Sequence, residues 1–325
     1  MRCSIRGFVW GRRVNQEKTL MAGIEPAAAH DAADAAQDLD AQRRQAFWRR
    51  VRGHRGLQAG ALIVLALLAV AVFAPWLAPH DPYAQSLAHR LVPPVWAPGG
   101  SWDYVFGTDQ VGRDYLSRLI YGTRISLIVG FGAAGVGCVI GVALGICAGY
   151  FGGRIDSLVS FLLTCQLALP GLLLAMALVF IIGPSLWVVI GIIGGLHWTY
   201  YLVVTRTSTL RLRQLDFVAA AKAVGSNRRQ ILFHEILPNL LNQIIVVFTF
   251  EVGIAVLAEA ALSFLGVGIQ PPTPSWGLMI AEGKMAIFHR PWLVVLPGIA
   301  LFLLVIGANL LGDGLRDVTS PDRRS

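Results

Sequence analysis

Six long apolar runs, separated by polar segments, constrain this 325-residue chain more than any other feature. A bilayer core offers no water to backbone N–H and C=O groups, so a span needs about 20 mostly apolar residues in a helix. With 55% hydrophobic and 14% charged residues, the chain has more apolar surface than a soluble domain of this length could bury. The sequence therefore predicts an all-α membrane protein with six transmembrane helices. The predicted spans are residues 57–76, 125–150, 157–182, 186–204, 240–265 and 293–311.

The distribution of positive charge predicts which way the chain crosses the membrane. Six arginines lie between residues 43 and 55, and five arginines and one lysine lie within 205–239. Because Lys and Arg are enriched in cytoplasmic connections, we expect both termini and the 205–239 connection in the cytoplasm and the connection 77–124 outside. The net charge of +8 is split among these loops rather than gathered on one face, so nucleic-acid binding is not predicted.

Three regions follow from the spans: a cytoplasmic tail at 1–56, a transmembrane domain at 57–317 and a C-terminal tail at 318–325. The first tail is rich in Ala, Asp and Gln in irregular order, which predicts a mobile segment. Met21 is an alternative start to Met1, because the residues between them show neither periodicity nor the layout of a signal peptide.

Glycine recurs every four residues in the second predicted span, at Gly137, Gly141, Gly145 and Gly149. At 3.6 residues per turn these positions form one slowly winding stripe, which lets another helix approach closely. Gly191 and Gly195 repeat the device more weakly in the fourth predicted span. A G-x-G-x-x-G match at 130–135 is rejected as a dinucleotide site, because it lies inside one continuous apolar run.

Three ionisable residues lie inside predicted spans: His197, Glu251 and Glu259. Such residues are costly in a bilayer and are candidates for a functional role. The two glutamates are eight residues apart and share one helix face, so they either line a water-filled pathway or make structural hydrogen bonds between helices. For His197, which has Trp198 beside it, a packing role is favoured.

The connection before the second predicted span is polar over 106–114 and then amphipathic to residue 122. This pattern predicts a turn followed by a short interfacial helix. Asp109, Arg113 and Asp114 either pair with one another there or are solvated separately.

No catalytic motif occurs in the chain. It contains no G-x-x-x-x-G-K-[ST], H-E-x-x-H, C-x-x-C or G-x-S-x-G pattern. We therefore expect neither an enzyme nor a metal or cofactor site, and any energy has to come from a partner.

The polar connection after the fourth predicted span contains a short amphipathic stretch. Residues 215–224 predict a helix with Phe217, Ala220, Ala221 and Val224 along one side, and Gly225 permits a sharp turn after it. A helix resumes at 228–237, and Pro238 marks where the fifth span begins. Small alanines allow this helix to sit closely in a groove of another protein, so a helix held between two spans can act as a lever.

This connection resembles the cytoplasmic loop of inner-membrane permeases of ATP-binding-cassette (ABC) importers, whose pattern is E-A-A, three residues, G, nine residues, I-x-L-P. The matching residues are Ala220, Ala221, Gly225, Leu237 and Pro238, whereas Ala219 and Glu235 depart from the pattern. Residues 106–130 and 259–277 are similar to signatures of the oligopeptide, dipeptide and nickel branch. The long first outside loop resembles the second permease of the pair, the dipeptide permease C type.

The resemblance implies a type I ABC permease of the bacterial inner membrane that forms half of a pathway for peptides or a related small solute. Implied partners are a second, different permease chain, two cytoplasmic ATPase subunits and a periplasmic solute-binding protein. The segment from Ala219 to Pro238 would dock on the ATPase. The segment 271–276 would turn outside and place a short helix at the surface that receives the binding protein, unless Trp276 and Trp292 simply anchor it at the membrane interface. Import of nickel chelates or glutathione, a secondary transporter and a membrane-embedded enzyme are the alternatives.

Overall fold

The computed structural model describes residue 45 and residues 48–319. The two alternative starts, most of the predicted tail 1–56, and residues 320–325 lie outside the described residues. The chain divides into two units at residue 54. In the first unit, residues 48–53 are helical. The second unit, residues 55–325, holds every predicted span.

Helices build the second unit, and its described residues contain no strand beyond an isolated bridge between Thr108 and Asp114. The all-α prediction is therefore confirmed. The α-helices are α2 (Arg55–Val72), α3 (Ala74–Leu77), α4 (Tyr115–Phe151), α5 (Gly153–Ala168), α6 (Gly171–Ile182), α7 (Leu186–Leu196), α8 (Trp198–Leu212), α9 (Asp216–Ala223), α10 (Arg228–Gln230), α11 (Leu237–Phe264), α12 (Trp276–Gly283) and α13 (Trp292–Thr319).

Five helical stretches are long and apolar enough to cross a membrane, and the bent pair α5 and α6 makes a sixth if it counts as one span. The two helices of this pair meet at an angle of 89°. The segment predicted as one span over 157–182 is therefore divided into two helices by a sharp bend. Pro170, the N-cap residue of α6, cannot donate a backbone hydrogen bond and separates the two helices.

Several predicted boundaries differ from the observed helices, and the helix predicted over 293–311 continues to Thr319. The helix predicted from residue 125 begins at Tyr115, so the outer connection ends at 114 and no separate interfacial helix precedes the span. The helix predicted over 186–204 continues to Leu212, and the helical stretch predicted from 240 begins at Arg228. Hydropathy marks the apolar part of a helix, whereas its polar end turns are stabilised by caps and side-chain partners that hydropathy does not register.

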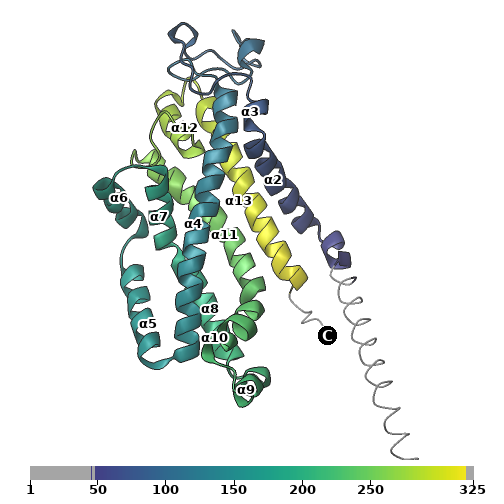
Figure 1. The fold of residues 1–325 in the computed structure, drawn as a ribbon. Coiled ribbons are helices and arrows are strands. Elements are labelled where there is room, and N and C mark those ends of the chain that lie inside the picture. The colour runs from purple at the N-terminus through teal and green to yellow at the C-terminus, as the bar shows by residue number, and fades with distance from the viewer. Residues whose placement is uncertain (1–44, 46–47, 320–325) are drawn as a thin grey trace, which may run out of the picture. The chain divides into compact units, whose positions relative to one another are not determined.

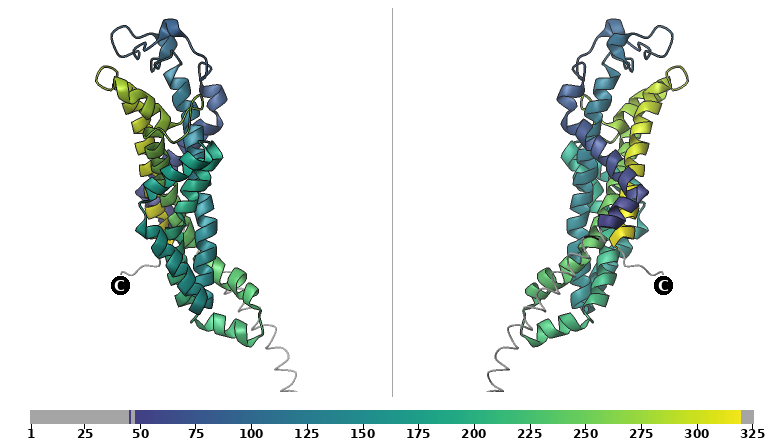
Figure 2. Two further views of the ribbon diagram at one scale, coloured as in Figure 1. Left: turned by 90° about the vertical axis from the view of Figure 1, so that its left-hand side faces the viewer. Right: turned by 90° about the vertical axis from the view of Figure 1, so that its right-hand side faces the viewer.

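Helix α4 runs through the centre of the unit and contacts α2, α7, α8 and α11 (Figure 1). Helix α12 contacts both α11 and α13. Residues 78–114 cover one end of the bundle, called the loop end below, and α9 lies at the opposite end, called the α9 end (Figure 1, Figure 2). The two ends are joined by α4, which spans 37 residues.

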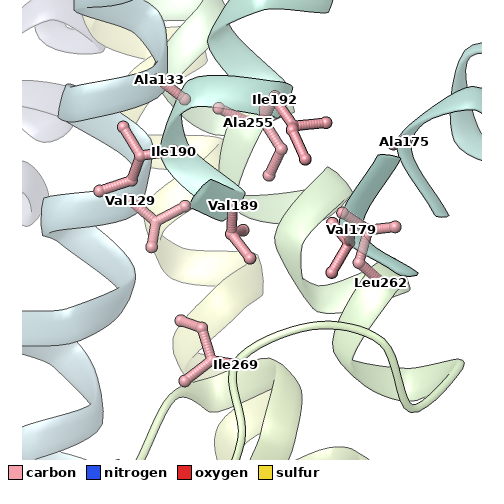
Figure 3. Packing of buried hydrophobic residues seen from close by; sticks show 11 residues of the cluster. Val129, Ala133, Ala175, Val179, Val189, Ile190, Ile192, Ala255, Leu262 and Ile269 are labelled. Carbon is pink, nitrogen blue, oxygen red and sulfur yellow. The ribbon is translucent and has the colours of Figure 1, made fainter. Parts of the chain in front are cut away.

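One apolar core lies where α4, α6, α7 and α11 meet (Figure 3). All its buried members except Leu262 are alanine, valine or isoleucine, among them Val129, Val189 and Ala255, each with no exposed surface. Lipid tails are as apolar as these side chains, so close van der Waals packing rather than the hydrophobic effect holds such helices together in a bilayer. This core places the α7–α8 junction and the bent α5–α6 pair around α11.

Candidate functional site

Helix α9 forms the centre of the segment predicted to dock a partner. It ends in a hydrogen bond from the Ser226 N–H to the Ala221 carbonyl at 3.0 Å, across Gly225 with φ of +88°. That left-handed conformation is available to glycine at little cost and closes a helix sharply. Asn227 then caps the next helix through a reciprocal pair of hydrogen bonds with Gln230. The predicted helix, turn and second helix are all present.

The buried side of α9 differs from the predicted one. Val218 is fully buried, and Phe217 and Ala221 pack beside it against the cluster at the α9 end. Ala220 and Val224, predicted on the same side as Phe217, are exposed. The buried cluster includes Ile146 of α4, Ile231 and Ile236 of the adjoining turn, and Leu240 and Ile244 of α11. Helix α9 is therefore fixed to α4 and α11 through one side and presents Ala219 and Ala220 on the other.

Pro238 lies in the first turn of α11, where the sequence predicted the fifth span to begin, but the chain is already helical before it. The helical stretch is continuous from Arg228 to Phe264, and Pro238 follows a π-helical turn at Ile231–Ile236. At the end of this turn the Leu237 N–H bonds to the Leu232 carbonyl, one residue further back than in an α-helix. The wider turn accommodates a proline inside the helix. Leu237 itself is partly buried, and Pro238 is exposed.

The four glycines of α4 face α7 and α8 at very short range. A Cβ at Gly141 would lie 2.2 Å from the Trp198 carbonyl oxygen, and one at Gly145 would lie 2.8 Å from the Leu202 oxygen. At Gly137 and Gly149 the nearest backbone oxygens would be 3.2 and 2.8 Å away. A side chain at any of these positions would push the helices apart.

The weaker glycine pair in α7 does not repeat this arrangement. No atom of the described residues lies within 4 Å of a Cβ built at Gly191 or Gly195. It is Gly194 that approaches α4, where its Cβ would lie 2.6 Å from the Ala133 oxygen. A four-residue spacing shows that two glycines share a helix face, but it does not show which face is packed.

The two membrane glutamates have separate partners. Glu251 of α11 lies 2.9 Å from Nδ1 of His197, at the junction of α7 and α8. Glu259 accepts hydrogen bonds from Ser263 at 2.7 Å and from Ser275 at 2.9 Å. Ser275 caps α12, so Glu259 ties α11 to the start of α12. Both glutamates are buried within the chain, and no sequence pattern indicated the pairing with His197.

A buried ion network joins the loop end to α12. Arg113 contacts Asp109 at 2.5 Å and Glu282 at 3.1 Å, and Arg118 contacts Glu282 at 2.9 Å and Asp109 at 3.4 Å. The side chain of Arg118 has no exposed surface. Of the three residues expected either to pair or to be solvated, Asp109 and Arg113 pair. Asp114 instead caps α4 through the Ser117 N–H at 2.8 Å.

Sequence inspection missed Arg118 and Glu282 as members of this network. Gly112 permits the turn between Asp109 and Arg113: its φ is +78°, and a Cβ there would lie 1.9 Å from the Ser86 oxygen. The signature residues of this segment therefore build a compact joint between the loop end and α12. Trp276 is fully buried and bonds to the Leu119 carbonyl, so it is not an interfacial anchor.

The described part of the chain contains no group of three or more His, Cys, Asp or Glu side chains that could hold a metal ion. What it contains is a helical membrane bundle with two kinds of polar feature: a projecting short helix at one end and buried charged pairs within it. These features are those of a helical membrane protein that spans the bilayer several times.

Comparison with known proteins identifies the family. Residues 141–325 match the model for the binding-protein-dependent transport system inner membrane component, and residues 42–94 match the N-terminal transmembrane domain of oligopeptide transport permease C. The chain belongs to this family: it is a permease subunit of an ABC importer and a multi-pass protein of the inner membrane. The resemblance drawn from the sequence is thereby confirmed.

Similar proteins cover most of the chain. It is 40% identical over 275 residues to the di/tripeptide transport system permease protein DppC of Pseudomonas aeruginosa, covering 85% of this chain and 91% of the relative. Identity to the dipeptide permease DppC of Haemophilus influenzae is 39%, covering 85% and 94%. Identity to the glutathione transport system permease GsiD of Pectobacterium atrosepticum is 39%, covering 86% and 91%.

Proposed function

We propose that this permease subunit forms half of a translocation pathway for peptides, with the α9 end in the cytoplasm and the loop end in the periplasm. The charge distribution supports this orientation. The connection at the α9 end carries five arginines and one lysine within 205–239, whereas residues 78–114 at the loop end carry two arginines, of which Arg113 is buried in the ion network. Six spans then return both termini to the cytoplasm.

The coupling role of α9 rests on one observation. Val218 anchors this helix in a cluster shared with α4 and α11, while Ala219 and Ala220 are exposed beside it. A partner that seats on the small exposed side chains can move α9, and the anchored side passes the motion to two helices that run to the opposite end. Two ATPase subunits are the proposed cytoplasmic partners, with a second, different permease chain and a periplasmic binding protein completing the importer.

The docking segment comprises Ala219, Ala220, Ala221, Gly225, Leu237 and Pro238. With alanine rather than glutamate at position 219, contact with the ATPase relies on shape more than on charge. The turn at Gly225 sets the angle at which the helix is presented, because its φ of +88° fixes the direction of the chain after α9.

The remaining candidate residues are assigned from their surroundings. Gly137, Gly141, Gly145 and Gly149 serve close packing of α4 on α7 and α8. Glu259, fully buried between Ser263 and Ser275, serves to hold α12 on α11. Glu251, which contacts His197 at the junction of α7 and α8, is assigned to the pathway.

Peptides are the proposed cargo because two of the similar permeases are named for dipeptide or di/tripeptide transport. Glutathione, itself a modified tripeptide, is the second candidate, supported by the similar glutathione permease. Uptake by a bacterium that lacks its own peptide permeases, but carries this chain with its partner subunits, tests the assignment. Uptake of a radiolabelled dipeptide is expected to be inhibited by unlabelled dipeptides. Inhibition by glutathione alone would assign the second cargo.

A further inference from the structure

Two helix breaks face each other near the middle of the bundle. Helices α5 and α6 are separated at Leu169 and Pro170, and α7 and α8 are separated at His197. The side chain of Gln166 bridges them by donating from Nε2 to the Leu196 carbonyl. His197 lies after the 11 residues of α7 and before the 15 residues of α8, well inside the stretch that is long enough to span the membrane. Irregular backbone at this depth is tolerated where it lines a cavity.

A cavity of about 260 Å³ lies at these breaks, between α5, α6, α7 and α11. Most of its wall is apolar, for example Leu172, Ile193 and Leu262, and its polar members are Gln166, His197 and Thr199. Sites for whole small molecules occupy roughly 300–1,000 Å³, so this cavity suits one end of a peptide rather than all of it.

The hydrogen bonds already made inside the protein determine what the cavity offers a ligand. The Leu196 carbonyl can only accept, so Gln166 uses its amide nitrogen there and leaves its Oε1 as an acceptor. The Glu251 carboxylate can only accept as well, so Nδ1 of His197 carries the proton in their 2.9 Å contact. Nε2 of a neutral His197, which has no partner among the described residues, is then also an acceptor.

The charges around the cavity also favour a cation as the ligand. None of the described residues that line it is lysine or arginine. Glu251 lies directly behind His197, and its side chain is 2% exposed. An ionised Glu251 therefore places a negative charge, and no compensating lysine or arginine, behind the cavity wall.

We infer that Gln166 and His197, with Glu251 behind them, form a transient binding site for the primary ammonium group of a peptide in transit. This inference rests on the proposed peptide cargo and adds which end of it the permease contacts. An ammonium group has three donors and suits a set of acceptors near a buried carboxylate. Its source is either the free N-terminus or a lysine side chain.

Photolabelling tests the inference without the selectivity of the binding protein. The complete complex of permeases and ATPases, in nanodiscs and without nucleotide, is exposed to a dipeptide that carries a diazirine on its second residue. Labelling of this chain is expected near the cavity, and an unlabelled free-amine dipeptide should reduce it. The same dipeptide with an acetylated N-terminus should compete at least about tenfold less well, which corresponds to the loss of one charge-assisted hydrogen bond.

Three variants complete the design. Glu251→Gln removes the carboxylate, Thr199→Val alters the wall with little change in volume, and Asp313→Asn removes the same charge from α13, outside the cavity. Glu251→Gln is expected to lower labelling about tenfold, on the scale of one charge-assisted hydrogen bond. Thr199→Val should lower it less, and Asp313→Asn should leave it unchanged. If Glu251→Gln prevents assembly of the complex, Thr199→Val and the comparison of free-amine with acetylated dipeptides still test the inference.

An acetylated dipeptide that bears lysine separates the two sources. Competition by this compound shows that a side-chain ammonium is accepted, and its absence assigns the site to the N-terminus. Equal competition by free-amine and acetylated dipeptides without lysine would overturn the inference. That failure differs from failure of the proposed function, in which the wild-type complex takes up no peptide at all.

Discussion

Replacing Gly141 with alanine tests the close packing of α4 against α8. The new Cβ would lie 2.2 Å from the Trp198 carbonyl oxygen and 2.6 Å from Cβ of Tyr201. Real Cβ atoms essentially never lie closer than 3.0 Å to another heavy atom, so the two helices have to move apart. The Trp198 oxygen belongs to the backbone and cannot rotate away, so the movement involves whole helices.

The expected cost follows from two opposing effects. Overpacking costs about 1–3 kcal/mol, and alanine in place of glycine in a helix returns about 0.5–1 kcal/mol. The net effect is a destabilisation of about 1–2 kcal/mol, which corresponds to a fall in melting temperature of roughly 2–6 °C for a domain of this size. The fall in melting temperature is measured by heating the purified chain in detergent and detecting the folded fraction by size-exclusion chromatography.

Gly135→Ala is the matched control for this experiment. Gly135 lies in the same helix, and no atom of the described residues comes within 4 Å of a Cβ built there. Only the gain in helix propensity then applies, so the melting temperature should stay the same or rise slightly. Equal melting temperatures for Gly141→Ala and Gly135→Ala would refute the assignment of the glycine stripe to helix packing.

Three further predictions concern other parts of the molecule. Gly225→Val should weaken co-purification of the ATPase, because a β-branched residue at φ of +88° costs about 1–3 kcal/mol, whereas Gly225→Asn should retain it; equal loss in both would contradict a conformational role. Glu282→Gln should lower stability by about 1–3 kcal/mol, since it leaves the buried Arg118 with Asp109 alone at 3.4 Å, and an unchanged melting temperature would show the network to be dispensable. With the native cysteines replaced, an impermeant thiol reagent added to intact cells should label Ser101→Cys but not Ser226→Cys; the reverse result would invert the proposed topology.

Much of the fold could be predicted from the sequence because a bilayer leaves few options. Long apolar runs have to become helices, and the glycine at 225 has to end one. The break between α5 and α6 could not be predicted from hydropathy, since residues on both sides of Pro170 are equally apolar. The early start of α4 was hidden for the opposite reason: Arg118 counts against a membrane helix until its partners Glu282 and Asp109 are known.

The candidate site was predictable in its local parts and not in its pairings. The short helix around Ala220 follows from composition, but which of its sides is buried depends on Ile146, Ile231 and Leu240 of other elements. The contact of His197 with Glu251 joins residues 54 positions apart, and it depends on how α8 and α11 are rotated against each other. Such rotations are set by packing across the whole bundle. The periodicity of apolar residues within one helix does not determine them.

Uptake of a radiolabelled dipeptide into proteoliposomes tests the central claim most directly. The vesicles contain the complete importer, with the binding protein added on the loop-end side and ATP supplied on the α9 side. The proposed function predicts accumulation that requires ATP, the binding protein and this chain together. Accumulation that persists without ATP, or that a proton gradient alone supports, would contradict it.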